Sequence, residues 1–207
     1  MVFSRQRIFA PLLVGVAVLA FALLNHVNPS FLPGDDAIYD QLSARDCADS
    51  GHCRLIGAPA SLPGFNHGAV WLDFLVAVRL LGGDTETQRE AVLGLLALSV
   101  ATLFAVVWRW LRPSIALPAA MLLVVALSVD TSPSRLVSPS AMIFPSILTA
   151  AGLLCYGLSG QRRFLAVSAF ALGVGLCTHI SSVCLVPALI VITLLGRPQP
   201  FRALLSA

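Results

Sequence analysis

The chain has 207 residues, of which 57% are hydrophobic and 11% are charged, and its mean hydropathy is +0.88. A soluble domain carries about 25% charged residues, so this composition excludes an ordinary water-soluble domain and predicts an integral membrane protein with the lipid bilayer as its partner. The net charge of +3 comes from arginine alone and is spread over connecting segments, which argues against nucleic acid as a partner.

The first element is an apolar run over residues 8–27, which matches one membrane span of about 20 residues. Basic residues precede the run, and residues 20–22 (Ala-Phe-Ala) form a small-residue pattern typical of a signal-peptide cleavage site. Two interpretations are therefore open, a retained span or a cleaved leader. The apolar character continues past the cleavage pattern, which favours the span.

A long acidic segment, residues 29–66, comes next. It opens with Pro33-Gly34-Asp35-Asp36, which predicts a turn and then a short helix with Asp35 as its N-cap and Asp36 in its first turn. The alternative role of these two carboxylates is chemical. Apolar surroundings raise the pKa of a carboxyl group, which can then serve as a general base.

Two of the five cysteines, Cys47 and Cys53, lie in this acidic segment. An oxidising compartment predicts a disulfide between them, and a reducing compartment predicts two free thiols. The other three lie in apolar runs and are predicted to be small buried side chains: Cys155, Cys177 and Cys184. The scattered histidines and cysteines have no metal-ligand spacing, so no metal site is predicted, although a divalent cofactor remains open.

Residues 67–82 are apolar, but they number only 16 and include Asp73 and Arg79. The positive-inside rule decides whether this run crosses the membrane. If it does not cross, one side holds eight of the 13 arginines and none of the ten acids; if it crosses, four arginines move to the acidic side. We therefore predict a helix that lies at the outer membrane interface, within an external loop over residues 29–87.

The remaining apolar runs predict five further spans, over residues 88–111, 114–130, 139–159, 163–178 and 181–196. The fold class is then all-α: residues 1–207 form one polytopic transmembrane helical bundle with six spans, and both termini lie in the cytoplasm. Small residues in the fifth span predict close helix packing: Ala166, Ala169, Gly173 and Gly175.

Three polar residues lie near the outer ends of these runs. Arg135 is the arginine of the second outer loop, where it either binds a phosphate or pairs with Asp130. His179 interrupts the last two spans, where it either faces a cavity or a partner or caps a tight turn. His67 starts the interfacial helix and is a weaker ligand candidate, because a polar residue is ordinary at that position.

Four stretches in this order resemble the N-terminal half of the GT-C glycosyltransferases, of the protein mannosyltransferase and aminoarabinose transferase type. They are DDAIY at 35–39, FNHGAVWLDFLVAVRLLGG at 65–83, TQREAVLGLLAL at 87–98 and GVGLCTHISSVCLVPALI at 173–190. The match covers most of this chain and about the first half of a typical family member. The resemblance thus implies that the chain is the N-terminal half of such an enzyme.

The resemblance implies an inverting transferase of the bacterial inner membrane, with a polyprenyl-phosphate-linked sugar as its donor and an acceptor hydroxyl at the outer face. Asp35 matches the family's general base, and Asp36 stands where the family has glutamate. The base takes the proton of the acceptor, which then displaces polyprenyl phosphate from the anomeric carbon of the sugar.

The implied substrate-binding residues are Tyr39, Asn66, His67, Arg135 and His179. Histidine stands in two places where the family has lysine, so any phosphate contact there needs a protonated imidazole or a neutral hydrogen-bond donor. The resemblance identifies neither the sugar nor the acceptor.

A second hypothesis is a non-catalytic polytopic membrane protein: a transporter half, a scaffold subunit or an inactive remnant. The replaced lysines favour it. A transporter is expected to have ionisable groups mid-span and broken helices at the membrane midplane. In this sequence the ionisable groups gather at the outer interface, which favours the enzyme.

Overall fold

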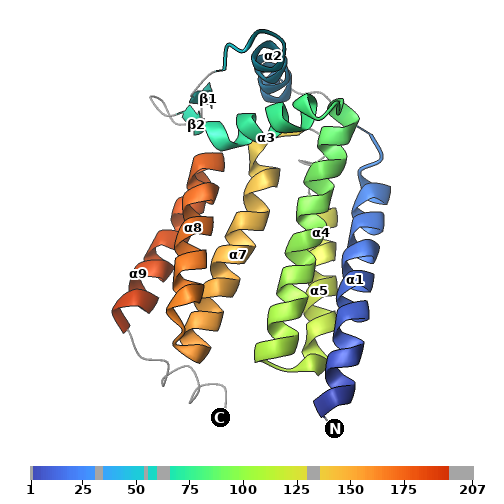
Figure 1. Cartoon of the computed structure of the whole chain (residues 1–207), viewed down its shortest axis with the longest axis vertical. Helices are drawn as coiled ribbons and strands as arrows, with labels where there is room; N and C mark the ends of the chain where they lie inside the picture. Colours follow the sequence, from blue (N-terminus) through green and yellow to red (C-terminus); the bar gives the residue numbers. More distant parts are fainter. Residues whose placement is uncertain (1, 31–34, 54–55, 60–65, 130–135, 196–207) are drawn as a thin grey trace.

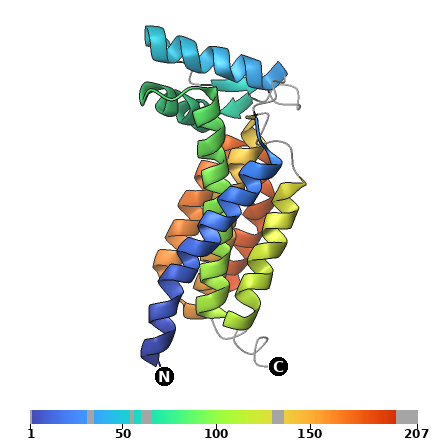
Figure 2. The ribbon, with the colours of Figure 1, turned by 90° about the vertical axis from the view of Figure 1, so that its right-hand side faces the viewer.

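The computed structural model of the chain is a bundle of helices with a smaller layer of structure across one end, which we call the cap (Figures 1 and 2). It describes residues 2–30, 35–53, 56–59, 66–129 and 136–195.

Within the described residues, three helices are long and apolar enough to cross a membrane: α1 (Val2–Val27), α4 (Thr85–Trp110) and α7 (Ser138–Ser159). Three shorter helices pack beside them: α5 (Pro113–Ser128), α8 (Arg162–Thr178) and α9 (Val186–Leu195). The described residues of each run predicted as a span are therefore mainly helical, and three of these helices have the length and composition of a span.

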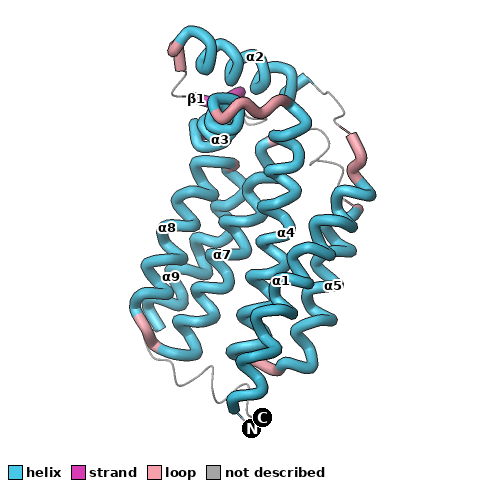
Figure 3. Tube along the Cα trace, turned by 45° about the vertical axis from the view of Figure 1, so that its right-hand side comes forward, coloured by secondary structure: helices cyan, strands magenta, loops and turns pink. Residues whose placement is uncertain are grey.

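The break predicted near His179 is present, but the helix after it starts differently from the prediction. Residues Ile180–Leu185 form a 3-10 segment, η1, before α9 begins at Val186. Pro187 lacks an N–H and cannot donate to the carbonyl of Val183, so regular α-helical pairing cannot continue through this stretch. Beyond the break, α8 and α9 lie side by side (Figures 1 and 3).

The cap consists of α2 (Asp35–Ser50), α3 (Ala69–Leu80) and an antiparallel pair of short strands, β1 (Ile56–Pro59) and β2 (Asn66–Gly68). In Figure 2, α2 and α3 lie across the bundle axis, one above the other. The helix expected after the Pro-Gly turn is present, but Asp35 is its first residue and not its N-cap.

The interfacial helix predicted over residues 67–82 is shorter, and His67 does not start it. His67 lies in β2 with Asn66, and the pairing of Ile56 with Gly68 keeps this stretch extended until α3 begins at Ala69. A Cβ on Gly68 would fall on the backbone carbonyl of Cys177, so glycine lets β2 approach the end of α8. Within the described ranges, this short ribbon is thus the only strand pairing among the helices.

The bundle core lies between α1, α4 and α5, whose buried side chains are almost all aliphatic. Its members are Ala20, Leu24, Leu93, Leu96, Ala97, Val100, Phe104, Val107, Ala116, Ala120, Val124 and Leu127. On one flank of this core, Phe9 stacks against Phe104 with ring centroids 6.4 Å apart. The apolar run predicted at residues 8–27 therefore packs along one side against α4 and α5, and most of its other side chains are exposed or half-buried.

A small residue lets α7 and α8 approach closely at Gly152 of α7, which was not among the residues predicted to pack. Of the four small residues predicted in the fifth span, Gly175 packs tightly, against Ser182 of η1. A Cβ on Gly152 would collide with Ser168 Oγ and would lie 2.9 Å from the Phe164 carbonyl oxygen. A Cβ on Gly175 would lie 2.8 Å from Ser182 Oγ, whereas one on Gly173 would meet nothing.

Other small residues predicted to be buried are exposed. Ala166 and Ala169 lie on the outer face of α8, and the thiols of Cys177 and Cys184 are also exposed, whereas Cys155 is buried as predicted. In lipid, small apolar side chains need no burial inside the protein, because the surrounding solvent is itself apolar.

The end of the bundle opposite the cap carries exposed arginines and aromatic rings. Arg109 and Arg112 flank the end of α4, and Arg163 follows at the start of α8. Trp110 packs edge-to-face on Phe164, with ring centroids 5.8 Å apart. Helix α1 begins and helix α9 ends at this end (Figure 1), and every acidic residue of the described part lies in the cap or at the start of α4.

The contact between α7 and α8 predicts how two glycine substitutions change stability, and one of them serves as the control. Gly152→Ala places a methyl group against a hydrogen-bonded serine and a backbone carbonyl, so we expect a loss of about 1–3 kcal/mol in the free energy of unfolding. Gly173→Ala meets open space and gains helix propensity, so we expect a change between zero and a gain of about 1 kcal/mol. Thermal unfolding of the detergent-solubilised variants measures both. Equal effects of the two substitutions would contradict the packing.

Candidate functional site

A second apolar core joins the cap to the bundle. Its buried members come from α2, α3, α4 and the start of α7: Ala44, Cys47, Trp71, Leu72, Leu75, Val76, Val92, Leu136 and Ala141. Leu136 has a φ of 50°, a left-handed conformation that is uncommon for a non-glycine residue. The cap is therefore packed onto the bundle and fixes the position of α2.

A buried hydrogen bond crosses from α3 to α2. The indole Nε1 of Trp71 donates to Asp40 Oδ2 at 2.8 Å, and the two residues are only 2% and 4% exposed. A buried carboxylate needs hydrogen-bond donors to offset the loss of water, and a buried indole N–H needs an acceptor. The pair satisfies both needs, and it links α2 to α3 through two residues that are 31 positions apart in sequence.

The corner between α3 and α4 is held by polar contacts. Gln88 is fully buried, and its Nε2 donates to the Leu75 carbonyl at 2.9 Å. Asp84 caps α4: its Oδ1 accepts from the backbone N–H and the hydroxyl of Thr87, both at 2.8 Å. The hydrogen bond from the Thr87 backbone is the main cause that lowers the pKa of Asp84. The Asp84 side chain is thus charged at neutral pH.

Arg89 ties α4 to the end of α1. Its guanidinium Nη1 donates to Asn25 Oδ1 at 2.8 Å and to the Asn28 carbonyl at 2.6 Å, and its Nε contacts Glu86 Oε2 at 2.7 Å. The Arg89 side chain is 4% exposed, whereas that of Glu86 is 49% exposed. The guanidinium is therefore engaged by protein groups, and its role is to fix where α1 ends, just before the segment that leads to α2.

The predicted catalytic pair lies in the first turn of α2. Asp35 and Asp36 are the first two residues of that helix, and their side chains lie outside the described part of the structure. Tyr39 follows one turn later and is 37% exposed. All three residues lie at the cap end of the bundle.

Of the other predicted ligand residues, two lie in β2 and one lies outside the described residues. Asn66 and His67 in β2 lie beside the end of α8, because Gly68 touches the backbone of Cys177, two residues before His179. The side chains of Asn66 and His67 are outside the described part, as is the whole of Arg135 with its candidate partner Asp130.

His179 has a defined structural role. It ends α8 and begins η1, and its Nδ1 accepts from the Ser181 N–H at 3.2 Å. This contact is the turn-capping role weighed for it, and it uses one ring nitrogen for the backbone.

The structure joins Cys47 and Cys53 by a disulfide, with Cα atoms 4.4 Å apart. Cys47 belongs to the core beneath the cap, and the disulfide closes the chain at the end of α2, where Gly51 takes a φ of 75°. Among the described residues, no group of three or more histidine, cysteine or acidic side chains could hold a metal ion.

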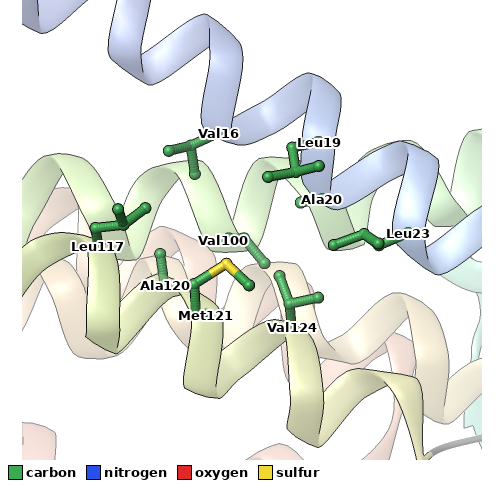
Figure 4. Close-up of a pocket in the computed structure, with 9 residues that line it drawn as sticks. All are labelled: Val16, Leu19, Ala20, Leu23, Val100, Leu117, Ala120, Met121 and Val124. Atoms are coloured by element: carbon green, nitrogen blue, oxygen red, sulfur yellow. The ribbon is translucent and has the colours of Figure 1, made fainter.

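An apolar crevice lies apart from the cap, between α1, α4 and α5 (Figure 4). Its lining is Val16, Leu19, Ala20, Leu23, Val100, Leu117, Ala120, Met121 and Val124, and its volume is about 10 Å³. That volume is close to the minimum that holds one water molecule, so the crevice is a packing feature and not a substrate pocket.

Sequence reasoning missed Asp40, Trp71 and Arg89, although a signal was present for each. Asp40 follows Asp36 by four residues, which puts both on one helix face. Trp71 lies in an otherwise apolar run and needs an acceptor. Arg89 begins a span, where a charge requires partners.

Comparison of this chain with protein-family models, with curated proteins and with solved structures finds no match.

The Arg89 contacts predict a stability effect that an exposed arginine lacks. Arg89→Gln removes charge-assisted hydrogen bonds from the buried junction of α1 and α4, so we expect a loss of about 1.5–3 kcal/mol in the free energy of unfolding. The control is Arg45→Gln, because Arg45 pairs with Asp49 at 3.4 Å while both side chains are more than 60% exposed and such pairs contribute about 0–1 kcal/mol. Denaturant unfolding in detergent compares them, and equal losses would contradict the Arg89 assignment.

The disulfide predicts the thiol count of the purified chain. Unfolded without reductant, the protein should titrate only the thiols of Cys155, Cys177 and Cys184, and after reduction it should titrate all five cysteines. Cys53→Ser should release Cys47 and raise the unreduced count by one. Five reactive thiols before reduction would show that the chain matures in a reducing compartment.

Proposed function

We propose that this chain is a membrane glycosyltransferase, or the N-terminal part of one, that transfers a sugar from a polyprenyl-phosphate donor to an acceptor hydroxyl at the outer face of the membrane. The observation that carries the proposal is the cap. A helix that begins with two adjacent acids lies across the end of an apolar bundle and is held there by buried polar contacts.

The proposed topology has six spans, formed by α1, α4, α5, α7, α8 and α9, with both termini in the cytoplasm. The charge distribution supports it: exposed arginines and aromatic rings gather at the end where α1 begins and α9 ends, and acidic residues gather at the cap. The cap then lies at the outer face of the bacterial inner membrane. This location also suits the disulfide between Cys47 and Cys53.

The proposed chemistry needs one base and a good leaving group. A carboxylate of the pair Asp35–Asp36 accepts the proton of the acceptor hydroxyl as its oxygen forms a bond to the anomeric carbon. The bond from that carbon to the phosphate oxygen breaks, and polyprenyl phosphate leaves with the electron pair. Because phosphate is already a stable leaving group, positioning and charge stabilisation supply the rest of the rate enhancement.

Two observations favour the non-catalytic alternative, which is a transporter half, a scaffold subunit or an inactive remnant. His179 stands where the resembling family has a lysine, and its imidazole is engaged in capping η1. Arg89, the buried arginine beneath the cap, is also engaged by protein groups. The phosphate contacts must then come from residues around β2 and Arg135.

The test uses membranes that contain the chain and polyprenyl-phosphate donors carrying radiolabelled mannose or aminoarabinose in parallel. We expect release of polyprenyl phosphate, and we expect the double variant Asp35→Asn/Asp36→Asn to slow it about 10²–10⁴-fold, the range of a lost general base. Asp49→Asn, on the exposed face of the same helix, should act as wild type. Unchanged release by the double variant would exclude the carboxylates, and no release above empty membranes from either donor would favour the alternative.

A further inference from the structure

Four exposed arginines gather at the end of the bundle opposite the cap. Two come from the junction of α4 and α5, and two from the first turn of α8: Arg109, Arg112, Arg162 and Arg163. Helix α4 ends and helix α8 begins at this end (Figure 1). Two segments that are far apart in sequence therefore build one basic surface.

Two aromatic rings join these segments. Trp110 of α4 packs edge-to-face on Phe164 of α8, with ring centroids 5.8 Å apart. The guanidinium carbon of Arg109 lies 5.1 Å from the centre of the Trp110 ring, and that of Arg163 lies 5.1 Å from the centre of the Phe164 ring. Both distances allow a cation–π attraction. The rings thus hold one guanidinium group from each segment beside a single aromatic pair, and we call these four residues the arginine–aromatic cluster.

The described part of the chain supplies no anion for this cluster. The first acidic residue in the sequence is Asp35 and the last is Asp130, and among the described residues none of the four arginines pairs with a carboxylate. Arg45 and Arg89, at the other end of the bundle, each have a carboxylate partner. The two arginines of α8 lie in its first turn, where the helix dipole adds further positive potential.

The position of the cluster along the bundle indicates which anion it meets. The apolar helix α4, which is long enough to cross a membrane, ends at Trp110. Tryptophan and arginine at the end of such a helix lie at the level of the lipid headgroups, where anionic phospholipids attract basic residues. The planar guanidinium group matches a phosphate with two parallel hydrogen bonds. Contact with a ring restricts the side chain beforehand and lowers the entropy lost on binding.

The face of α8 beside the cluster suits the acyl chains of a lipid. Val167 and Phe170 follow Arg163 by four and seven residues, which puts all three on one side of the helix. Both apolar side chains are exposed. A headgroup held at Arg163 therefore has apolar surface directly beneath it, toward the middle of the bundle.

We propose that the arginine–aromatic cluster binds the phosphate of an anionic phospholipid at the membrane face opposite the cap. The phosphate oxygens accept from the guanidinium N–H groups of Arg109 and Arg163, while Arg112 and Arg162 add positive potential beside them. The site requires only that the bundle lies in a membrane. It is independent of the proposed transfer, so either proposal can fail while the other stands.

The test measures which lipid the purified chain retains. The chain is passed through mixed micelles that contain equal amounts of phosphatidylglycerol and phosphatidylcholine with the same acyl chains, and the co-eluting lipid is quantified by mass spectrometry. We expect at least about fivefold enrichment of phosphatidylglycerol, the effect of one basic residue near an anionic surface. Arg109→Gln/Arg163→Gln should remove most of this enrichment. Arg45→Gln, which alters an exposed arginine of the cap, is the control and should keep it.

A second variant separates a built site from diffuse charge. Arg109→Lys/Arg163→Lys keeps both charges but loses the planar groups that contact the rings and the phosphate, so we expect it to lose at least about half of the enrichment. Wild-type enrichment in the lysine variant, or equal losses in the glutamine variant and Arg45→Gln, would overturn the site. No enrichment in the wild type would overturn it as well. Loss of the bound lipid to excess inorganic phosphate, but not to sodium chloride of equal ionic strength, would assign the cluster to free phosphate and overturn the lipid.

Discussion

Lipid can neither hydrogen-bond the backbone nor solvate a charge, and this constraint arranges the described part of the chain. Hydroxyl groups inside the apolar helices donate to the carbonyl four residues earlier. The residues that do so are Ser99, Ser128, Thr149, Ser159, Thr178 and Thr193. Charged side chains have no such local solution, so they gather at the two ends of the bundle.

The cap is the consequence at one of those ends. Acids and arginines that water would otherwise solvate lie against an apolar core, and two of them, Asp40 and Arg89, are buried and matched to protein groups. Asp40 accepts from Trp71, and Arg89 donates to groups at the end of α1. The same contacts hold the end of α1 against α4 and hold α2 against α3. Stability and placement of the first turn of α2 thus depend on the same polar contacts.

The sequence predicted most of the bundle because apolar run length is a strong signal: the runs 139–159 and 163–178 agree with α7 and α8 to within one residue. The prediction from sequence was wrong where pairing between distant segments decides the local conformation. His67 lies in a strand because β1 pairs with β2, and no local feature announces that pairing. For the candidate site, charge patterning located the cap and its acids, but the contact between residues 40 and 71 depends on tertiary packing and could not be read from either segment alone.

The placement of charge also bears on the choice between an enzyme and a transporter. In the described helices of the bundle, charged residues lie within the first or last two turns, and α5, α7 and α9 carry none. A charge in mid-membrane is costly and is retained where it forms a path across the bilayer. A bundle with apolar helix centres and a polar cap has its reactive groups in one plane at its end. That arrangement fits the proposed transfer, in which a donor anchored in lipid and an acceptor from water are both expected at the cap end of the bundle.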